Sequence, residues 1–380
     1  MRPTSALYRQ ALARPHQVAF HVTSTDIFGV PLTTDSLGAP LLRDLPFSKG
    51  AVTASMTNRV TRTASLTVSD DWYPRTASAP FAPEAAVIRI DAGLKYGDGT
   101  EEVFRVFTGR VYDVTRSEDG TVTVQCDDFA ADVIGAQLEQ IWTVRNRSSV
   151  LEEIRALILD SLPSATFTVG TAIDAPVPDL NWDKDRGSAL DNLAQALGAR
   201  WYALGDGSFT VNRLPYEVGI PPLTMTDGPG GTISAARISR SRDGVANSVT
   251  VVSERTDGTS PVRSTSRNTA SGSPTRYGDR FGRVTQVINA QTPLTQAEAN
   301  TVSQTQLGAA TALSEQWDVA CTPDYALEPG DALRYIVTGT GTNARLMGDQ
   351  ILDRITYPLD TTTTQSLSGR GPVPPDIAVS

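Results

Sequence analysis

The feature that most constrains this chain is a strict alternation of apolar and polar side chains in its first third. Residues 63–68 place Ala64, Leu66 and Val68 on one face, and threonine or serine on the other. Residues 121–126 repeat the pattern. Because successive side chains of a strand point to opposite faces, this period of two predicts strands with one buried and one solvated face. Such strands are typical of antiparallel sheets.

Strand candidates dominate two stretches of the chain, one before residue 130 and one after residue 220. The remaining candidates of the first stretch are 17–23, 87–90 and 102–114. An Asp119-Gly120 turn leads into the strand at 121–126, so we expect one antiparallel β-domain over about 15–130. The candidates of the second stretch are 233–240, 247–253, 282–288, 317–321, 332–337 and 350–357. The fold class predicted from these patterns is mainly β, with an α+β component.

Helical signals occupy the region between the two stretches. Ser149 and Glu152 fit a capping box that opens a helix, and Pro163 ends that helix. A second helix is expected at 187–197, followed by a hairpin over 201–212. These elements predict a small α+β module over 146–219. Further helices are expected at 5–13 and, from a second capping box at Thr295 and Glu298, over about 295–313.

Composition excludes several classes of protein. The 380 residues carry a net charge of −9, so a protein that grips nucleic acid through clustered lysine and arginine is not expected. A passive channel for DNA is still compatible, because an acidic wall repels the polymer. No apolar signal segment or membrane-spanning run of about 18 residues is evident. Cys126 and Cys321 do not make a disulfide framework, and Cys126 continues a buried alternation.

Candidate catalytic and metal-binding residues are few. His16 and His21 are the only histidines, and their spacing suits neither a zinc site nor a Ser-His-Asp triad. The adjacent carboxylate pairs are Asp70-Asp71, Glu101-Glu102 and Asp127-Asp128. Adjacent residues of a strand face opposite ways, so we interpret these pairs as turn residues and not as a glycosidase pair.

Two further features have structural interpretations. Asp183-Lys184-Asp185 resembles the opening of a calcium loop but lacks its continuation, so it predicts a salt-bridged helix N-terminus. Trp182 and Trp201 flank a predicted helix and are expected in the core of the module. The sequence therefore predicts no catalytic, cofactor-binding or metal-binding residues, no cofactor, and no enzyme activity.

The order of short motifs resembles a known family. A strand at 104–111 and the turn into 122–128 are followed by the capped helix and by Leu193–Gly198, which runs into Trp201-Tyr202. Residues 247–251 then begin the second β-rich stretch, which contains the Thr295-capped helix and the Pro329-Gly330-Asp331 turn. Over about 15–358 this order is similar to that of the tail hub proteins (baseplate hub or minor tail proteins) of long-tailed bacteriophages and contractile injection machines.

The resemblance implies two tube-type antiparallel β-barrel domains separated by a small α+β module. Their expected extents are 1–145 and 220–358, with the module at 146–219, the packed helix near 295–313 in the second barrel, and an extended tail at 359–380. No internal sequence repeat between the two β-rich stretches is evident, so their equivalence is implied by the family alone.

The function implied by the resemblance is structural. Such hubs form a homotrimeric, pseudo-sixfold ring that joins the tail tube to the tail tip and leaves a channel for DNA. The expected partners are further copies of the chain, the tail tube or distal tail protein, the tape-measure protein and tip or fibre proteins, in a virion tail assembled in the host cytoplasm. The loops at 254–282 and the tail at 361–380 are either docking elements for neighbouring tail proteins or, respectively, a flexible loop and an unstructured chain end. The alternatives are a carbohydrate-binding or receptor-binding tail protein and a tail-associated cell-wall hydrolase.

Overall fold

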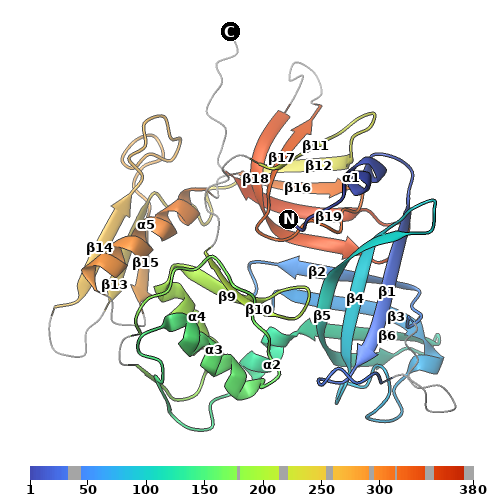
Figure 1. The fold of residues 1–380 in the computed structure, drawn as a ribbon. Helices are drawn as coiled ribbons and strands as arrows, with labels where there is room; N and C mark the ends of the chain where they lie inside the picture. Colours follow the sequence, from blue (N-terminus) through green and yellow to red (C-terminus); the bar gives the residue numbers. More distant parts are fainter. Residues whose placement is uncertain are drawn as a thin grey trace.

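The computed structural model describes residues 1–32, 44–177, 180–213, 221–253, 260–290, 295–312, 315–338 and 346–371. Twelve of the described strands form a single sheet, and smaller elements surround it (Figure 1). The sheet consists of two groups of six strands, which follow one another along the sequence. We call them the first unit and the second unit.

The first unit contains the strands of the N-terminal part of the chain. In sheet order they are β1 (Gln17–Thr25), β4 (Val87–Lys95), β5 (Glu101–Arg116), β6 (Thr121–Asp128), β3 (Arg62–Ser69) and β2 (Lys49–Ser55). All neighbours are antiparallel. The unit curls, since β1 and β4 cross in front of β2 and β3 in Figure 1. The N–H of Leu45, shortly before β2, donates to the carbonyl oxygen of Val22 in β1 (2.7 Å), which brings the two ends of the unit together.

The second unit contains strands from the last two-fifths of the chain. In sheet order they are β11 (Leu223–Thr226), β17 (Ala332–Val337), β18 (Leu346–Pro358), β19 (Gln365–Gly371), β16 (Glu315–Cys321) and β12 (Ile233–Arg240). The turn between β11 and β12 joins the two ends of this unit, with the N–H of Gly231 donating to the carbonyl oxygen of Gly228. Gly228 and Gly230 have positive φ, which a glycine adopts without strain.

The two units share one topology. Numbered one to six by sequence within each unit, both sets of strands have the sheet order 1-4-5-6-3-2. Both also carry a bulge in the fifth strand, at Tyr112 in β5 and at Asp353 in β18. The units differ in the pairing of the first and fourth strands, which is antiparallel for β1–β4 and parallel for β11–β17. The chain therefore contains a structural repeat that its sequence does not display.

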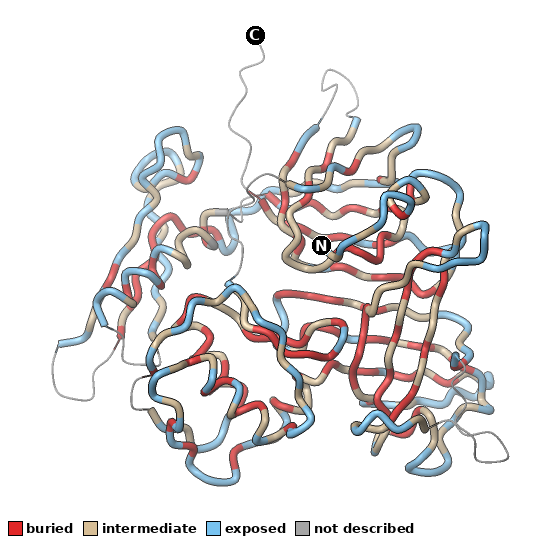
Figure 2. Tube along the Cα trace, viewed as in Figure 1, coloured by how far each residue is buried: buried red, intermediate tan, exposed pale blue. Residues whose placement is uncertain are grey.

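One strand pair joins the units into a continuous sheet. The second strand of the first unit, β2, pairs antiparallel with the last residues of β18, the fifth strand of the second unit. We call this pair the internal seam. Strands β3, β6, β16 and β19 bury alternate residues (Figure 2). One apolar cluster runs through both units, with Tyr325 and Tyr357 stacked 6.4 Å apart.

A compact α+β module follows the first unit in sequence and lies beside it (Figure 1). Its helices are α2 (Phe129–Gly135), α3 (Val150–Ser161) and α4 (Arg186–Ala196), and its strands are β7 (Trp142–Thr143), β8 (Asn181–Trp182), β9 (Ala199–Ala203) and β10 (Phe209–Arg213). The predicted cap of α3 is confirmed, because the Ser149 hydroxyl accepts from the N–H of Glu152 (3.0 Å). Asp185 caps α4 in the same way, through the N–H of Ser188.

A second small α/β unit is inserted between β12 and β16. Its sheet has the order β14 (Val262–Arg267), β13 (Ser248–Ser253), β15 (Thr285–Ala290), and α5 (Gln296–Ala312) packs on β13 and β14. The helix expected near 295–313 therefore exists, but it covers this separate sheet and not a barrel. Two short helices remain, α1 (Ala6–Leu12) and the 3-10 helix η1 (Asp70–Trp72).

The predicted fold class is confirmed: the chain is mainly β, with a large antiparallel sheet and a small α+β module. The expectation of an extended tail over 359–380 is wrong for residues 365–371, which form β19 inside the sheet. Alternate residues of β19 are buried, and a serine- and glycine-rich strand gives little hydrophobic signal. Residues 372–380, like 254–259 of the predicted loops, lie outside the described residues. In the described part of the chain, no helix is both long and apolar enough to cross a membrane.

Candidate functional site

The two units and the module meet at a partly buried cluster of charged side chains. Its members are Arg62 at the start of β3, Glu328 in the turn before β17, and Arg2 at the N-terminus. We call this cluster the central joint. It gathers residues that are more than 250 positions apart in sequence, so it forms only when the chain has folded completely.

Arg62 is the most deeply buried member, with a relative exposure of 2%. Its Nη2 donates to Glu328 Oε1 (3.1 Å), and its Nη1 donates to the carbonyl oxygen of Val106 in β5 (3.2 Å). Desolvation acts to lower the pKa of Arg62, but the negative charge of Glu328 opposes it, and the pKa is raised overall. An unpaired charge at such a site is strongly destabilising, so the ion pair ties β3 to the second unit.

Arg2 completes the joint from the other side. Its Nη2 donates to the same Glu328 oxygen (2.7 Å) and to the carbonyl oxygen of Arg105 (3.0 Å), while Nη1 donates to the carbonyl oxygen of Tyr325 (2.6 Å). One guanidinium group thus contacts β5 of the first unit and the Tyr325–Glu328 turn of the second. The N-terminal segment therefore links the two units.

The module reaches the joint through the turn of its β9–β10 hairpin. The Thr108 hydroxyl in β5 donates to the carbonyl oxygen of Gly205 (3.0 Å). A Cβ on Gly205 would lie 2.4 Å from the carbonyl oxygen of Arg105 and 2.9 Å from Arg2 Nη2. Only glycine permits this close approach, so the hairpin turn is fitted against the joint.

Asp128 links the first unit to the module and is fully buried. It ends β6 and caps α2, accepting from the N–H of Ala130 (2.9 Å) and from the N–H of Arg62 (2.7 Å). Desolvation raises the pKa of its carboxyl to about 7, against the two N–H donors and the Arg62 charge, which lower it. The predicted pair Asp127-Asp128 is therefore a strand end with a helix cap and does not face a cavity as two carboxylates.

The other carboxylate pairs also divide between faces. Glu101 accepts from His21 Nε2 (2.8 Å), whereas Glu102 accepts from the Ser5 hydroxyl (2.6 Å) and the Tyr96 hydroxyl (2.8 Å). Asp70 pairs with Arg116, and its neighbour Asp71 is exposed. The pairs lie at strand ends as expected, but their interpretation as turn residues is wrong for two of them, because Glu101-Glu102 begins β5 and Asp127-Asp128 ends β6.

The two histidines occupy different environments. His21 lies between two carboxylates, Asp44 and Glu101, each 2.8 Å from a ring nitrogen. His16 donates from Nδ1 to the carbonyl oxygen of Arg14 (2.8 Å). Trp201 is buried in the module core, and Trp182 packs against that core from a half-buried position, as predicted for both.

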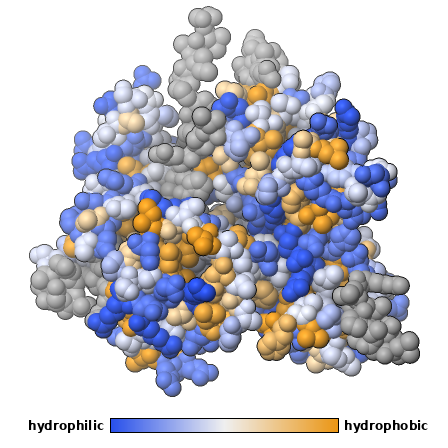
Figure 3. Space-filling view, viewed as in Figure 1, coloured by the Kyte–Doolittle hydropathy of each residue, from blue (hydrophilic) through white to orange (hydrophobic). Residues whose placement is uncertain are grey.

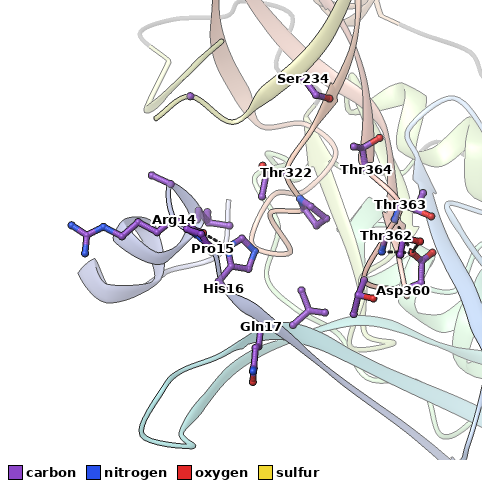
Figure 4. Close-up of a pocket in the computed structure, with 16 residues that line it drawn as sticks. Arg14, Pro15, His16, Gln17, Ser234, Thr322, Asp360, Thr362, Thr363 and Thr364 are labelled. Carbon is purple, nitrogen blue, oxygen red and sulfur yellow. Dashed lines mark hydrogen bonds between the residues drawn. The ribbon is translucent and has the colours of Figure 1, made fainter. Parts of the chain in front are cut away.

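A pocket of about 760 Å³ lies between the start of β1, β12 and the turn before β19 (Figure 4). It contains His16, Thr322 and Asp360. Asp360 accepts from the N–H groups of Thr362 (2.8 Å) and Thr363 (2.7 Å), and these hydrogen bonds lower its pKa to about 2 although burial acts to raise it. His16 and Asp360 thus each hydrogen-bond their own turn.

Several strand edges are open among the described residues, including those of β5 and β12. Residues 112–116 of β5 extend past the end of β4 and have no partner strand on that side. Tyr112 within this edge is 73% exposed. At the far end of the second unit, β12 pairs with β16 on one side only. Exposed sheet edges present unpaired N–H and C=O groups that another strand can take up.

The module carries a further apolar surface. In Figure 3 hydrophobic side chains gather over the module, whereas the unit of β13–β15 and α5 is mostly hydrophilic on this face. A groove of about 240 Å³ lies between α3, the segment 167–172 and β10. Val169 beside this groove is 98% exposed. Nothing in the described residues indicates what covers it.

Sequence reasoning missed the central joint and the open edges. Arg62 directly precedes the alternating strand, and Glu328 precedes a Pro-Gly-Asp turn, so both resemble solvated strand-end residues. Strand β2, which was not predicted from the sequence, has Gly50, Val52 and Ala54 on its inner face. These residues are small and weakly apolar, so they give little hydrophobic signal. Long-range pairing, which local patterns do not encode, creates both features.

Comparisons with known proteins show which solved structures have a similar fold. No protein-family model and no curated protein matches the chain in sequence. The structure of a tail protein from Neisseria meningitidis matches with a TM-score of 0.65 at 12% identity, over 92% of this chain and 96% of that one. A 43 kDa tail protein of prophage MuSo2 from Shewanella oneidensis matches with a TM-score of 0.60 at 12% identity, over 93% and 98% of the two chains. Prophage tail protein gp18 from Listeria monocytogenes matches with a TM-score of 0.55 at 8% identity, over 92% and 94%. The chain thus has the fold of phage tail proteins along nearly its whole length, and the resemblance seen in the motif order is confirmed at that level.

Proposed function

We propose that this chain is a structural tail hub of a phage or phage-like particle. In this proposal three copies close into a ring that joins the tail tube to the tail tip and leaves a bore for DNA. The ring contacts the tail tube or distal tail protein, the tape-measure protein and tip or fibre proteins. The chain has no catalytic role in this assembly and resides in the virion tail.

The observation that carries the proposal is the duplicated six-stranded unit. Three copies of a chain with two equivalent units present six units around a ring, which allows a threefold assembly to match a sixfold partner. The likeness to three tail proteins over almost the full length of each supports the same role. The net charge of −9 suits a bore that must pass DNA without holding it.

The described residues support the two alternatives less well. A carbohydrate-binding protein needs exposed aromatic platforms, and the two candidate tryptophans do not supply one, because Trp201 is buried and Trp182 packs against the module core. A wall hydrolase needs an acid and a base facing one bond, and the adjacent carboxylate pairs are divided between separate contacts.

The test is the mass and symmetry of the purified full chain at micromolar concentration. Native mass spectrometry and class averages of negatively stained particles should give three copies around a central hole, with six similar lobes. A chain that remains a single copy, or that forms open filaments without a bore, would contradict the ring.

A further inference from the structure

The open edges of β5 and β12 occupy positions equivalent to those of the two strands of the internal seam. In the internal seam, the second strand of one unit (β2) pairs with the fifth strand of the other (β18). The open edges belong to the second strand of the second unit (β12) and the fifth strand of the first unit (β5). We propose that β12 of one copy pairs with β5 of the next copy in the same way that β2 pairs with β18. This interface rests on the ring proposed above and names the surface that would close it.

The strand registers give the residues of the interface. Strand β2 pairs with β3, and β12 pairs with the equivalent strand β16, so the two registers can be compared. Residues 51–55 of β2 then correspond to residues 237–241, of which the last directly follows β12. Through β6 and β19, residues 354–358 of β18 correspond to residues 113–117 at the end of β5. The internal pairs run from Ser55–Arg354 to Ala51–Pro358. The equivalent pairs between copies therefore run from Ser241–Asp113 to Arg237–Ser117.

The fifth strands have the same geometry at this point. In each unit the bulge, at Tyr112 or Asp353, lies just before the segment that pairs or would pair across the seam. In the internal seam the N–H of Met56 donates to the carbonyl oxygen of Asp353 (2.8 Å). The equivalent bond between copies joins the N–H of Arg242 to the carbonyl oxygen of Tyr112. A bulge bends and twists a strand, so its repetition gives both edges the same direction.

The two edges carry opposite net charge. Residues 237–242 contain Arg237, Arg240 and Arg242 and no carboxylate, and Arg240 pairs with Glu315 of its own copy. Residues 113–119 contain three carboxylates and one arginine, which pairs with Asp70. Arg242, which lies over the Phe281 ring, would face the exposed Tyr112 ring of the next copy, where an arginine next to a tyrosine ring adds a cation–π contact.

The experiment is a disulfide cross-link in the full chain. In the internal seam the hydroxyl oxygens of Thr53 and Thr356 lie 3.4 Å apart, and their equivalents are Ser239 and Thr115. The variant carrying Ser239→Cys and Thr115→Cys in one chain should form disulfides between copies under mild oxidation, since such a pair meets the distance requirement. Non-reducing gels should show a ladder that ends at three copies and collapses with reductant. Cys126 and Cys321 are buried and free and do not contribute.

The matched control moves one cysteine along β12. Ser234→Cys with Thr115→Cys places the thiols about 16 Å apart in this register, at about 3.3 Å per residue, and should give no ladder. A second variant, Ile238→Pro, removes an N–H from the open edge and should lower the number of copies while near-native circular dichroism persists.

The outcomes separate this interface from the ring itself. A wild-type ring in which the Ser239–Thr115 pair fails to cross-link, or cross-links no better than the control, would overturn the interface and leave the ring standing. A wild-type chain that stays a single copy would overturn both.

Discussion

Replacing Glu328 by glutamine removes the counter-charge of a guanidinium group that is almost fully buried. Arg62 keeps its bond to the carbonyl oxygen of Val106, but no carboxylate then neutralises it at 3.1 Å. Breaking a buried ion pair at one partner costs about 3–5 kcal/mol. Glutamine still offers an acceptor oxygen, and the Glu328 side chain is 25% exposed, so we expect about 3 kcal/mol, the lower end of that range.

The assay is urea denaturation followed by intrinsic tryptophan fluorescence, since Trp317 is buried in the core of the second unit. Glu328→Gln should lower the urea midpoint clearly. The double variant Arg62→Met with Glu328→Gln should recover part of the loss, because it removes the most deeply buried charge and leaves only the more exposed Arg2 without its carboxylate. The matched control is Asp70→Asn, which removes the carboxylate from an exposed ion pair with Arg116 and should leave the midpoint close to that of the wild type. If Glu328→Gln and Asp70→Asn gave the same midpoint, the role assigned to the central joint would be refuted.

Two further predictions concern pH. The hydrogen bond to Asp44 raises the pKa of His21; desolvation opposes this rise, and the hydrogen bond to Glu101 adds to it. The stabilising effect of protonated His21 is therefore present below pH 6.5 and is lost as the pH rises through the raised pKa. His21→Gln should therefore remove less than about 1 kcal/mol of stability at pH 5.5 and nothing at pH 8.5, measured by urea midpoints; equal losses at both would count against the histidine. Burial raises the pKa of Asp128 to about 7, so wild-type stability should fall between pH 4 and 7 as this carboxyl ionises. Asp128→Asn, which preserves the α2 cap, should reduce this loss of stability between pH 4 and 7 by at most on the order of 4 kcal/mol. If the pH profile of the variant matched that of the wild type, the carboxyl would already be ionised at pH 4.

Local sequence patterns predicted much of the fold. The alternating strands at 63–68 and 121–126 lie within β3 and β6, and the capping box at Ser149 opens α3. These elements were predictable because periodicity and capping act over a few residues. The position of α5 was not, because its sequence shows that a helix forms but not which sheet it covers.

The central joint was beyond prediction for a different reason. Arg62 and Glu328 are 266 residues apart, and each stands in a local context typical of a solvated strand end. Their burial follows only from the internal seam, which brings the second unit against β3. The burial of a charge is a property of the completed fold, so an isolated strand gives no sign of it.

The structural repeat escaped detection because the two cores are filled in different ways. Through the strand registers, Ala64 in β3 corresponds to Trp317 in β16, and Phe107 in β5 corresponds to Gly348 in β18. A Cβ on Gly348 would lie 2.7 Å from the Trp317 ring, so the large side chain of one strand requires the absence of one on the other. The first unit reverses this arrangement, with a small residue in β3 and a large one in β5. Cores tolerate such exchanges if volume and pattern are kept, so the topology and the bulge persist while the residues at equivalent positions diverge. A comparison of side chains position by position therefore misses the repeat, whereas strand order and register reveal it.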